Sequence, residues 1–287
     1  MEKHSRILLD TFKSLIEYLE QNNYNWFVAY GTLLGTVRHK GMIPWDDDID
    51  IFMPREDFDR FISEREIIRK ESKYAVIAPG DENYYLSFAK YYDTHTTIWE
   101  MNHYHVTFGV YVDVFCLDYF CGSKQDFLKL IHKHQKLWNS YSNSLIHYSL
   151  SYLKWVIKGK HIKTLLLLPK NYISSLFTDT KSVKEKYFDF LERAKCEDYK
   201  TSNYCAWLQQ DIVYKSEWFR KYKMMRFEDI EVRVPIGYHD FLKERYGNYM
   251  TPPPEDKRIP NASHTSYYTN FDESLSITEI EKVLKPD

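Results

Sequence analysis

Three aspartates at alternate positions, Asp46, Asp48 and Asp50, constrain the fold of this chain more than any other feature. In an extended strand successive side chains point to opposite faces, so these carboxylates would share one face while Ile49 and Ile51 would point into a core. Carboxylates held side by side repel one another, and a divalent cation removes that penalty. Because oxygen ligands favour a hard ion, the stretch predicts a half-buried strand over residues 46–52 that carries Mg²⁺ or Mn²⁺.

Two simpler explanations of the acidic stretch fit its neighbours less well. Runs of acids are usually solvated turns, but the apolar alternation and the flanking Trp45 and Phe52 favour a strand. A calcium-binding EF-hand loop needs glycine at its sixth position and glutamate at its twelfth, where this chain has Ile51 and Asp57.

A Gly-Thr pair lies shortly before the acids. Residues 24–30 are rich in aromatic and β-branched side chains and predict a strand, Gly31 and Thr32 follow at once, and Leu33 to Val37 predict a short helix. Free backbone N–H groups at a helix N-terminus can bind phosphate. Such pairs are common in ordinary turns, but one followed closely by an Asp-x-Asp strand has the layout of a nucleotidyltransferase site.

Residues 31–53 closely resemble the signature of the LicD family, whose bacterial members transfer phosphocholine from CDP-choline to cell-surface glycans. Fukutin-related enzymes, which use CDP-ribitol, share this core. Residues 110–118 and 234–258 are similar to the family's later hydrophobic-Asp-hydrophobic strand and to its C-terminal block, in the same order. Residues 120–225 match poorly, and Cys116 stands where the family often has proline.

The resemblance implies a nucleotidyltransferase fold used for phospho-alcohol transfer. It makes Asp48 and Asp50 the core metal ligands, with Asp46 nearby, and Asp113 a third acid on a neighbouring strand. Asp113 would also accept the proton of the attacking hydroxyl. Without the resemblance, a lone aspartate among Val and Phe would indicate only a buried structural residue.

Basic side chains near these motifs are the candidates for phosphate binding. Arg38, His39 and Lys40 lie between the Gly-Thr pair and the acids, where they could hold a pyrophosphate. The simpler alternative is a solvated helix C-terminus, where cations are favoured. The predicted substrate-binding and phosphate-binding residues are Gly31, Thr32, Arg38, His39, Lys40, Lys257, Arg258 and His264.

The whole chain of 287 residues suits one large domain or a core with an insertion. We predict an α/β (α+β) fold with a nucleotidyltransferase-type mixed sheet and flanking helices. Residues 1–122 and 201–287 would form two parts of the catalytic domain, and residues 123–200 a helical basic insertion. Outside the insertion, the patterns predict helices over residues 5–22, 55–69 and 238–246, and strands near 74–78, 85–92, 110–117, 204–207 and 227–234.

Lysines concentrate in the middle of the chain. Between Lys124 and Ser175 nine lysines face one aspartate, so this segment carries +8 and, since the whole chain carries −2, the rest carries −10. Leucines and Trp155 accompany the lysines, as is typical of helices that bind an anionic membrane surface. An ordinary amphipathic insertion with solvated lysines is the alternative. The net charge and the absence of arginine from the segment argue against a nucleic-acid partner.

The chain has four cysteines, Cys116, Cys121, Cys196 and Cys205. None forms a Cys-x-x-Cys pair, so reduced thiols of a cytoplasmic protein are expected. A zinc site is the weaker alternative, with Cys116, Cys121 and either His132 or His134 as ligands. No apolar run follows Met1 and no stretch of about twenty apolar residues occurs, so neither a signal peptide nor a membrane span is expected.

The combined prediction is a Mg²⁺- or Mn²⁺-dependent transfer of a phospho-alcohol, phosphocholine first, from a CDP-activated donor. The acceptor would be a glycan or lipid-linked oligosaccharide, CMP would be released, and the protein would sit peripherally on the inner face of the plasma membrane. A DxD glycosyltransferase remains open, although only 45 residues precede Asp46, too few for the usual nucleotide-binding half. A non-catalytic, metal-dependent glycan-binding protein also remains open, but it would need no phosphate-binding turn.

Overall fold

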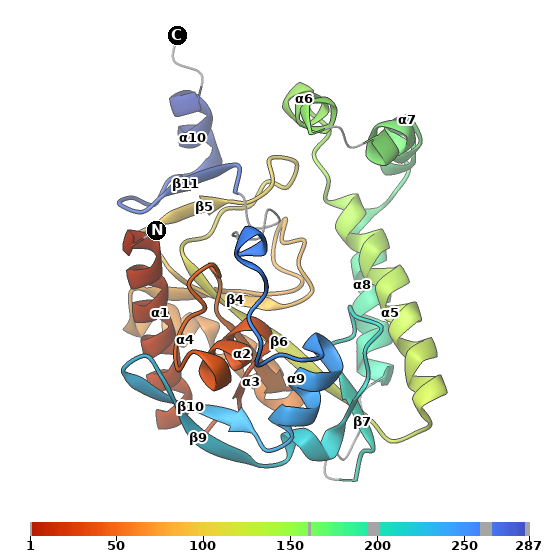
Figure 1. Cartoon of the computed structure of the whole chain (residues 1–287). Helices are drawn as coiled ribbons and strands as arrows, with labels where there is room; N and C mark the ends of the chain where they lie inside the picture. Colours follow the sequence, from red (N-terminus) through yellow and green to blue (C-terminus); the bar gives the residue numbers. More distant parts are fainter. Residues whose placement is uncertain (1, 160–161, 195–200, 259–265, 285–287) are drawn as a thin grey trace.

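A mixed β-sheet forms the centre of the computed structural model, which describes residues 2–159, 162–194, 201–258 and 266–284 (Figure 1). The main strands follow the order β1 (Phe27–Val28), β2 (Asp50–Pro54), β6 (Tyr111–Phe120), β4 (Ala89–Asp93) and β3 (Tyr74–Ile77). β2 and β6 are parallel, and the other neighbours along this order are antiparallel. The α+β fold with a mixed sheet is therefore confirmed.

Shorter strands extend this core. At its far end β6 pairs with β7 (Tyr204–Ala206), which in turn pairs with β8 (Tyr214–Lys215). Two separate pairs are β9 (Tyr222–Phe227) with β10 (Ile230–Pro235), and β5 (Thr97–Trp99) with β11 (Tyr268–Asn270). Residues from both ends of the chain thus meet around the central sheet.

The register of the central strands brings three charged residues side by side. β2 pairs with β6 so that Asp50 lies opposite Asp113, and β4 pairs with the same strand so that Lys90 also lies opposite Asp113. All five residues of β2 are buried, as are most of β6. The sheet therefore carries two carboxylates and an ammonium in its interior.

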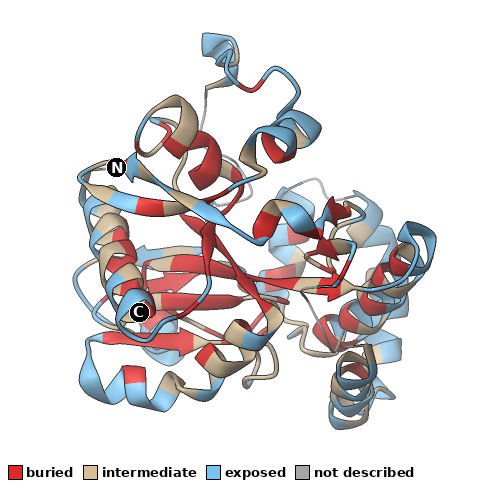
Figure 2. Ribbon diagram, turned by 90° about the horizontal axis from the view of Figure 1, so that it is seen from below, coloured by how far each residue is buried: buried red, intermediate tan, exposed pale blue. Residues whose placement is uncertain are grey.

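Helices cover the sheet and enclose its core. The first of them, α1 (Glu2–Gln21), packs against β4 and β6 through residues spaced three or four apart, namely Leu8, Phe12, Leu15 and Leu19. The other helices of the core are α2 (Tyr30–Arg38), α3 (Arg55–Ser63), α4 (Arg65–Glu71) and α9 (Tyr238–Tyr246). Figure 2 shows the buried residues concentrated in the central strands and on the helix faces that meet them.

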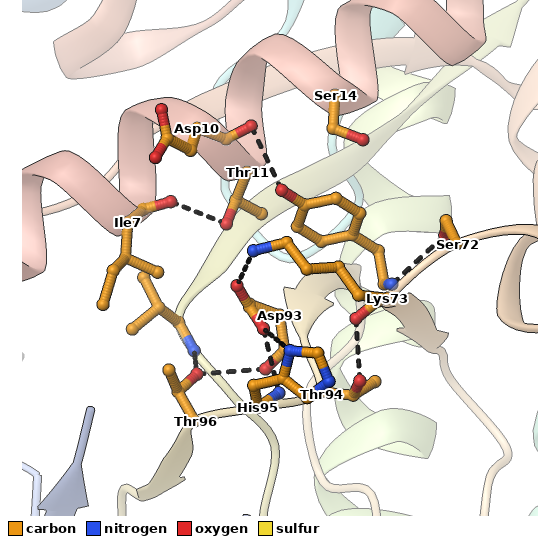
Figure 3. A network of polar contacts seen from close by, with 12 residues as sticks. Ile7, Asp10, Thr11, Ser14, Ser72, Lys73, Asp93, Thr94, His95 and Thr96 are labelled. Carbon is orange, nitrogen blue, oxygen red and sulfur yellow. Dashed lines mark hydrogen bonds and ion pairs between the residues drawn. The ribbon is translucent and has the colours of Figure 1, made fainter. Parts of the chain in front are cut away.

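The turn after β4 is held by the buried carboxylate of Asp93 (Figure 3). Lys73 Nζ donates to Asp93 Oδ2 at 2.6 Å, and the backbone N–H of His95 donates to Oδ1 at 2.9 Å. The Thr96 hydroxyl donates to the Asp93 carbonyl at 3.0 Å and accepts from the N–H of Val110 at 2.8 Å. These contacts tie the end of β4 to the start of β6 and so hold the two strands in register.

The described part of the central segment consists of four helices joined by short loops. Its helices are α5 (Lys124–Ser144), α6 (Leu150–Lys158), α7 (Ile162–Leu176) and α8 (Thr180–Ala194). α5 packs along α8, where His134 Nε2 lies 3.0 Å from the hydroxyl of buried Tyr187. α6 and α7 lie beyond one end of this pair, at the upper right of Figure 1. Among the described helices, none is long and apolar enough to cross a membrane.

Three predicted elements differ from the observed ones. The acidic strand predicted over 46–52 begins only at Asp50, because β1 ends opposite Ile51 and β6 reaches back only as far as the carbonyl of Ile49. The strand predicted over 24–30 is reduced to β1, since α2 already begins at Tyr30. The single helix predicted over 55–69 is two helices that meet at Glu64.

The expectation of four reduced thiols is wrong for Cys121, which is disulfide-bonded. Cys116 and Cys205 are free and buried, and Cys196 lies outside the described residues. A disulfide sulfur cannot act as a thiolate ligand, so the alternative zinc site that included Cys121 is excluded.

Buried histidines should make the fold sensitive to acid. Burial lowers the pKa of His134 to about 4, whereas an unfolded histidine has a pKa of about 6.5. As the pH falls from about 6.5 towards 4, the unfolded chain binds protons that the folded chain does not, so the free energy of unfolding falls. Over this pH range, we expect the free energy of unfolding of His134→Gln to fall by about 1–3 kcal/mol less than that of the wild type.

Urea unfolding of the wild type and of His134→Gln between pH 7.5 and pH 4.5 measures this difference. His132→Gln is the matched control, because His132 lies on the same helix with a side chain that is 62% exposed. Equal pH dependence of stability in the wild type and in His134→Gln would contradict the prediction.

Candidate active site

Carboxylates from the acidic loop and from two strands form the candidate site. Asp50 and Asp113 are only 6% and 8% exposed and lie opposite one another on parallel strands. Ligand oxygens of Asp46, Asp47 and Asp48 all lie within 4.8 Å of one another. Asp47 belongs to this cluster although it was absent from the predicted ligand set. Asp113 lies on the strand next to Asp50, as predicted, whereas Asp46 and Asp48 lie on a loop and do not share a strand face with Asp50.

The pKa shifts of the strand aspartates link them to the loop. Burial raises the pKa of Asp50 well above its usual value, and the charges of Asp48, Asp113 and Asp46 raise it further. Burial also raises the pKa of Asp113 to about 7, against the opposing effect of Lys90. Each carboxylate makes its neighbours harder to ionise, so the site favours a bound positive charge.

Lys90 supplies one such charge from within the protein. Its Nζ donates to Asp113 Oδ1 at 2.8 Å and lies 3.3 Å from Glu100 Oε1. The ammonium also lies 3.2 Å from the ring centroid of Tyr111 and 5.0 Å from that of Phe108. Sequence analysis missed this residue, and the only signal was a single lysine among the apolar and aromatic residues of β4, ahead of Asp93.

Glu100 completes the surroundings of Lys90. The hydroxyls of Tyr85 and Tyr111 each donate to its carboxylate at 2.5 Å. Burial alone would raise the pKa of Glu100, but Lys90 and the two hydroxyls together hold it below the usual value. Lys90 therefore sits between two ionised or partly ionised carboxylates, as a buried ammonium requires.

The Gly-Thr pair lies in the first turn of α2 and positions the acids. Thr32 is buried, and its hydroxyl accepts a hydrogen bond from the backbone N–H of Asp50 at 2.8 Å. A Cβ atom on Gly31 would come within 2.4 Å of Asp46 Oδ2, so only glycine allows the carboxylate to lie this close to the helix. The observed contacts of this pair are with the acidic residues, and phosphate binding by it stays a prediction.

The β9–β10 turn fixes the loop that leads from α2 to the acids. Glu228 lies in this turn, and its Oε1 accepts from the backbone N–H of Met42 at 2.8 Å. Its own backbone N–H donates to the carbonyl of Lys40 at 2.8 Å. The start of the acidic loop is thus held by a segment almost two hundred residues further along the chain.

Three of the predicted basic residues gather beside the acidic loop. Burial and the charge of Arg258 lower the pKa of Arg38, and burial together with both arginines lowers the pKa of His39. The indole ring of Trp45 lies 5.7 Å from the His39 ring and 5.3 Å from the Arg258 guanidinium. Arg38 Nη1 donates to the carbonyl of Tyr249 at 2.8 Å. Arg38 and Arg258 carry the charge of this cationic cluster, and His39, whose Nδ1 accepts from Arg38 Nε at 3.4 Å, belongs to it as a neutral imidazole. The cationic cluster of Arg38, His39 and Arg258 is suited to an anion.

The remaining predicted basic residues are not part of this cluster. Lys40 is exposed, and its Nζ donates to the carbonyl of Val37 at 3.1 Å. Lys257 is exposed next to Arg258 on the C-terminal segment. His264 lies outside the described residues, so its predicted role is not examined by the structure.

Tyr246, which is 38% exposed at the end of α9, lies near both the acids and Arg38 and was not among the predicted residues. Burial raises its pKa to about 12 against the effect of Arg245, and the charges of Asp50 and Asp46 add to the rise. Tyr246 in turn raises the pKa of Arg38. Its position at the end of the helix predicted over 238–246 carried no sequence signal for this role.

Comparisons with known proteins agree with this arrangement. Residues 23–147 match the nucleotidyltransferase domain shared by LicD, FKTN and FKRP. The chain is 26% identical over 268 residues to the lipopolysaccharide cholinephosphotransferase LicD of Haemophilus influenzae, which covers 91% of this chain and 94% of that protein.

Two shorter matches come from rickettsial proteins of uncharacterised function. A protein of Rickettsia typhi is 46% identical over 56 residues, which is 20% of this chain and 18% of that protein. One of Rickettsia prowazekii is 46% identical over 55 residues, which is 19% of this chain and 21% of that protein. The domain match and the near full-length similarity lead to one conclusion: residues 23–147 are a nucleotidyltransferase domain of the LicD family, and the chain is similar to a LicD phosphotransferase along almost its whole length.

Proposed function

We propose that this protein transfers phosphocholine from CDP-choline, or from a closely related CDP-alcohol, to a hydroxyl of a cell-surface glycan or its lipid-linked precursor. The observation that carries the proposal is the juxtaposition of buried Asp50 and Asp113 with an acidic loop and with the cationic cluster. Similarity to a lipopolysaccharide cholinephosphotransferase along almost the whole chain supports phosphocholine as the group that is moved.

The acids suit a divalent metal ion. Five carboxylates from residues 46–50 and Asp113 offer only oxygen ligands, and burial together with repulsion from neighbouring carboxylates raises the pKa of Asp50 and Asp113. Mg²⁺ or Mn²⁺ matches this donor set, with Asp46, Asp48, Asp50 and Asp113 as its proposed ligands. When bound, the ion would neutralise charge on the donor's diphosphate and on the departing CMP.

The protein's own residues have separate roles in the proposed reaction. The acceptor oxygen attacks the phosphorus of phosphocholine, the bond to CMP breaks, and the hydroxyl proton passes to Asp113. Lys90 occupies Oδ1 of Asp113, so Oδ2 is assigned to receive that proton. Arg38, His39 and Arg258 bind the diphosphate oxygens, because they lie together with few carboxylates to neutralise them.

The two competing classes of function receive less support. A DxD glycosyltransferase would have a large nucleotide-binding sheet ahead of its acids, whereas in the described chain only β1 precedes them. A non-catalytic glycan-binding protein would not need Lys90 to hold a second carboxylate beside the metal ligands. A CDP-alcohol is therefore the favoured donor.

The insertion supports a peripheral location on the inner face of the plasma membrane. None of the residues of α7, all of which the structure describes, is buried, and Leu166 is 75% exposed. Lys163 and Lys170 lie on the same helix, which contains no acid. An amphipathic helix of this composition binds anionic lipid through apolar burial and charge together. Docking there would bring a lipid-linked acceptor to the site.

The metal assignment predicts opposite effects on stability with and without the ion. Asp48→Asn and Asp50→Asn should each raise the melting temperature in metal-free buffer, because they relieve repulsion between carboxylates. Both should lose most of the stabilisation by Mn²⁺, which for the wild type at about 100 times Kd is about 2.7 kcal/mol. Transfer activity should be lost in both.

Thermal unfolding with and without Mg²⁺ or Mn²⁺ measures these effects. Asp189→Asn, an identical change at an exposed position on α8, is the control and should behave as the wild type. A wild-type response to Mn²⁺ in either site variant would refute the assignment of that residue as a ligand.

The donor assignment predicts that CDP-choline stabilises the protein more strongly than UDP-sugars when Mg²⁺ is present. Arg38→Met should weaken donor binding by about 1–3 kcal/mol, because it removes a charge-assisted contact to phosphate. Isothermal titration with both nucleotides measures this, and Arg69→Met, at an exposed position on α4, is the control. Binding of UDP-sugars in preference to any CDP-alcohol would instead favour a glycosyltransferase.

The membrane assignment predicts that α7 controls sedimentation with anionic vesicles. The combined change of Lys163→Gln, Lys170→Gln, Leu166→Ser and Leu176→Ser should weaken binding, with each lysine contributing about 1 kcal/mol. High salt should weaken wild-type binding as well, because charges are screened over about 8 Å at physiological ionic strength.

The matched control carries the same types of change elsewhere on the surface, namely Lys70→Gln, Lys243→Gln, Ile67→Ser and Met224→Ser. It should sediment with vesicles as the wild type does. A wild type that ignores anionic vesicles at low salt would show that α7 has no membrane role.

A further inference from the structure

We propose that a second pocket binds an anionic saccharide, namely the phosphate- or carboxylate-bearing part of the acceptor glycan. The pocket, of about 750 Å³, lies between α6, the paired strands β5 and β11, and α10 (Ile277–Leu284). This size is within the range of sites that bind small organic ligands. The inference deepens the proposed function, because it assigns the acceptor to a surface separate from the acids.

The floor of the pocket is a rigid aromatic pair. The ring centroids of Trp99 and Tyr267 lie 5.1 Å apart at 80°. Trp99 is buried, and its Nε1 donates to the carbonyl of Tyr104 at 2.8 Å. Tyr267 is 40% exposed, and its backbone N–H donates to the carbonyl of Glu100 at 3.0 Å. A fixed and partly exposed tyrosine offers an apolar ring face beside a hydroxyl, which suits the face and the hydroxyls of a sugar ring.

One face of α6 forms a polar wall. Ser151, Lys154 and Lys158 follow one another at helical spacing and all line the pocket. Asn102 Nδ2 donates to Ser151 Oγ at 2.9 Å, and Ser151 Oγ lies 3.5 Å from the Tyr267 hydroxyl. Among the ion pairs of the described residues, neither lysine has a carboxylate partner. Two ammonium groups are therefore available to a ligand.

Two histidines line another side of the pocket. The ring centroids of His105 and His147 lie 3.9 Å apart, with the two rings tilted by 35°. The backbone N–H of His147 donates to the carbonyl of His103 at 2.7 Å, which fixes the loop before α6. Burial and the neighbouring His147 lower the pKa of His105, so the charge balance rests on the lysines. Against these two lysines, Glu281 is the one carboxylate among the residues that line the pocket. The pocket therefore favours an anion.

A chain of hydrogen bonds and an ion pair connects the pocket with Asp113 of the candidate active site. Tyr267 is hydrogen-bonded to the backbone of Glu100, and the Glu100 carboxylate lies 3.3 Å from Lys90, which in turn holds Asp113. On its other side the pocket is bounded by α6, which packs on the exposed helix α7. A glycan that emerges from a membrane beside α7 would therefore meet this pocket before it reaches the acids.

The test measures binding of a phosphorylated oligosaccharide, released from lipopolysaccharide by deacylation, to the full chain without donor. The wild type should bind it, and both Tyr267→Ala and the double change Lys154→Gln with Lys158→Gln should weaken binding about tenfold or more. Removing the phosphates from the oligosaccharide should weaken its binding to the wild type. The dephosphorylated oligosaccharide should then bind the wild type and the double lysine variant with equal affinity. In transfer assays the variants should raise KM for the oligosaccharide with little change in kcat.

Matched controls are Tyr222→Ala, at another exposed tyrosine, and Lys70→Gln with Lys243→Gln, and both should bind as the wild type does. Circular dichroism establishes that each variant is folded. Wild-type affinity in the pocket variants, or no binding by the wild type, would overturn the inference. Loss of CDP-choline binding in the pocket variants would also overturn it, since the pocket would then serve the nucleotide.

The results of this test distinguish a failure of the pocket assignment from a failure of the proposed reaction. Saccharide binding that depends on these residues, without any release of CMP from CDP-choline, would refute the reaction and leave the pocket assigned. Release of CMP by a protein that does not bind the saccharide would refute the pocket alone.

Discussion

A buried lysine among carboxylates is the interaction on which the rest of this site depends. Asp50 and Asp113 lie in the interior on adjacent strands, and the acidic loop adds further negative charge against them. Out of water such groups would protonate or force the strands apart. Lys90 lies on a third strand, β4, and its ammonium lies between the carboxylates of Asp113 and Glu100. The register of β4 against β6 therefore places a positive charge beside the buried carboxylates.

The surrounding elements keep that arrangement in place. Thr32 anchors the first residue of β2, Gly31 leaves room for the Asp46 carboxylate, and Glu228 holds the loop between them. On the other side Asp93 fixes the end of β4. A loop that carries three acids would otherwise be mobile, because their mutual repulsion opposes order. These neutral and charged contacts therefore preorganise the proposed metal ligands before any substrate arrives.

In the proposed reaction, one part of the chain binds the donor and another part binds the acceptor. The core and the C-terminal segment supply the acids and the cationic cluster, which would bind the diphosphate of the donor. The helical insertion supplies an exposed apolar helix and one wall of the second pocket, which would bind the acceptor. Because donor and acceptor would bind to separate surfaces, substitutions in the insertion could change which glycan is bound without altering the metal site.

Local patterns in the sequence determined the elements, and the tertiary structure decided which side chains meet. Periodicity predicted α1, α9, the helical insertion and a buried strand at the acidic stretch, because each pattern lies within one element. It could not show that β2 begins at Asp50, since that depends on how far β1 extends beside it. The roles of Lys90 and Tyr246 were likewise invisible, because strand register and helix packing bring them to the acids from distant parts of the chain.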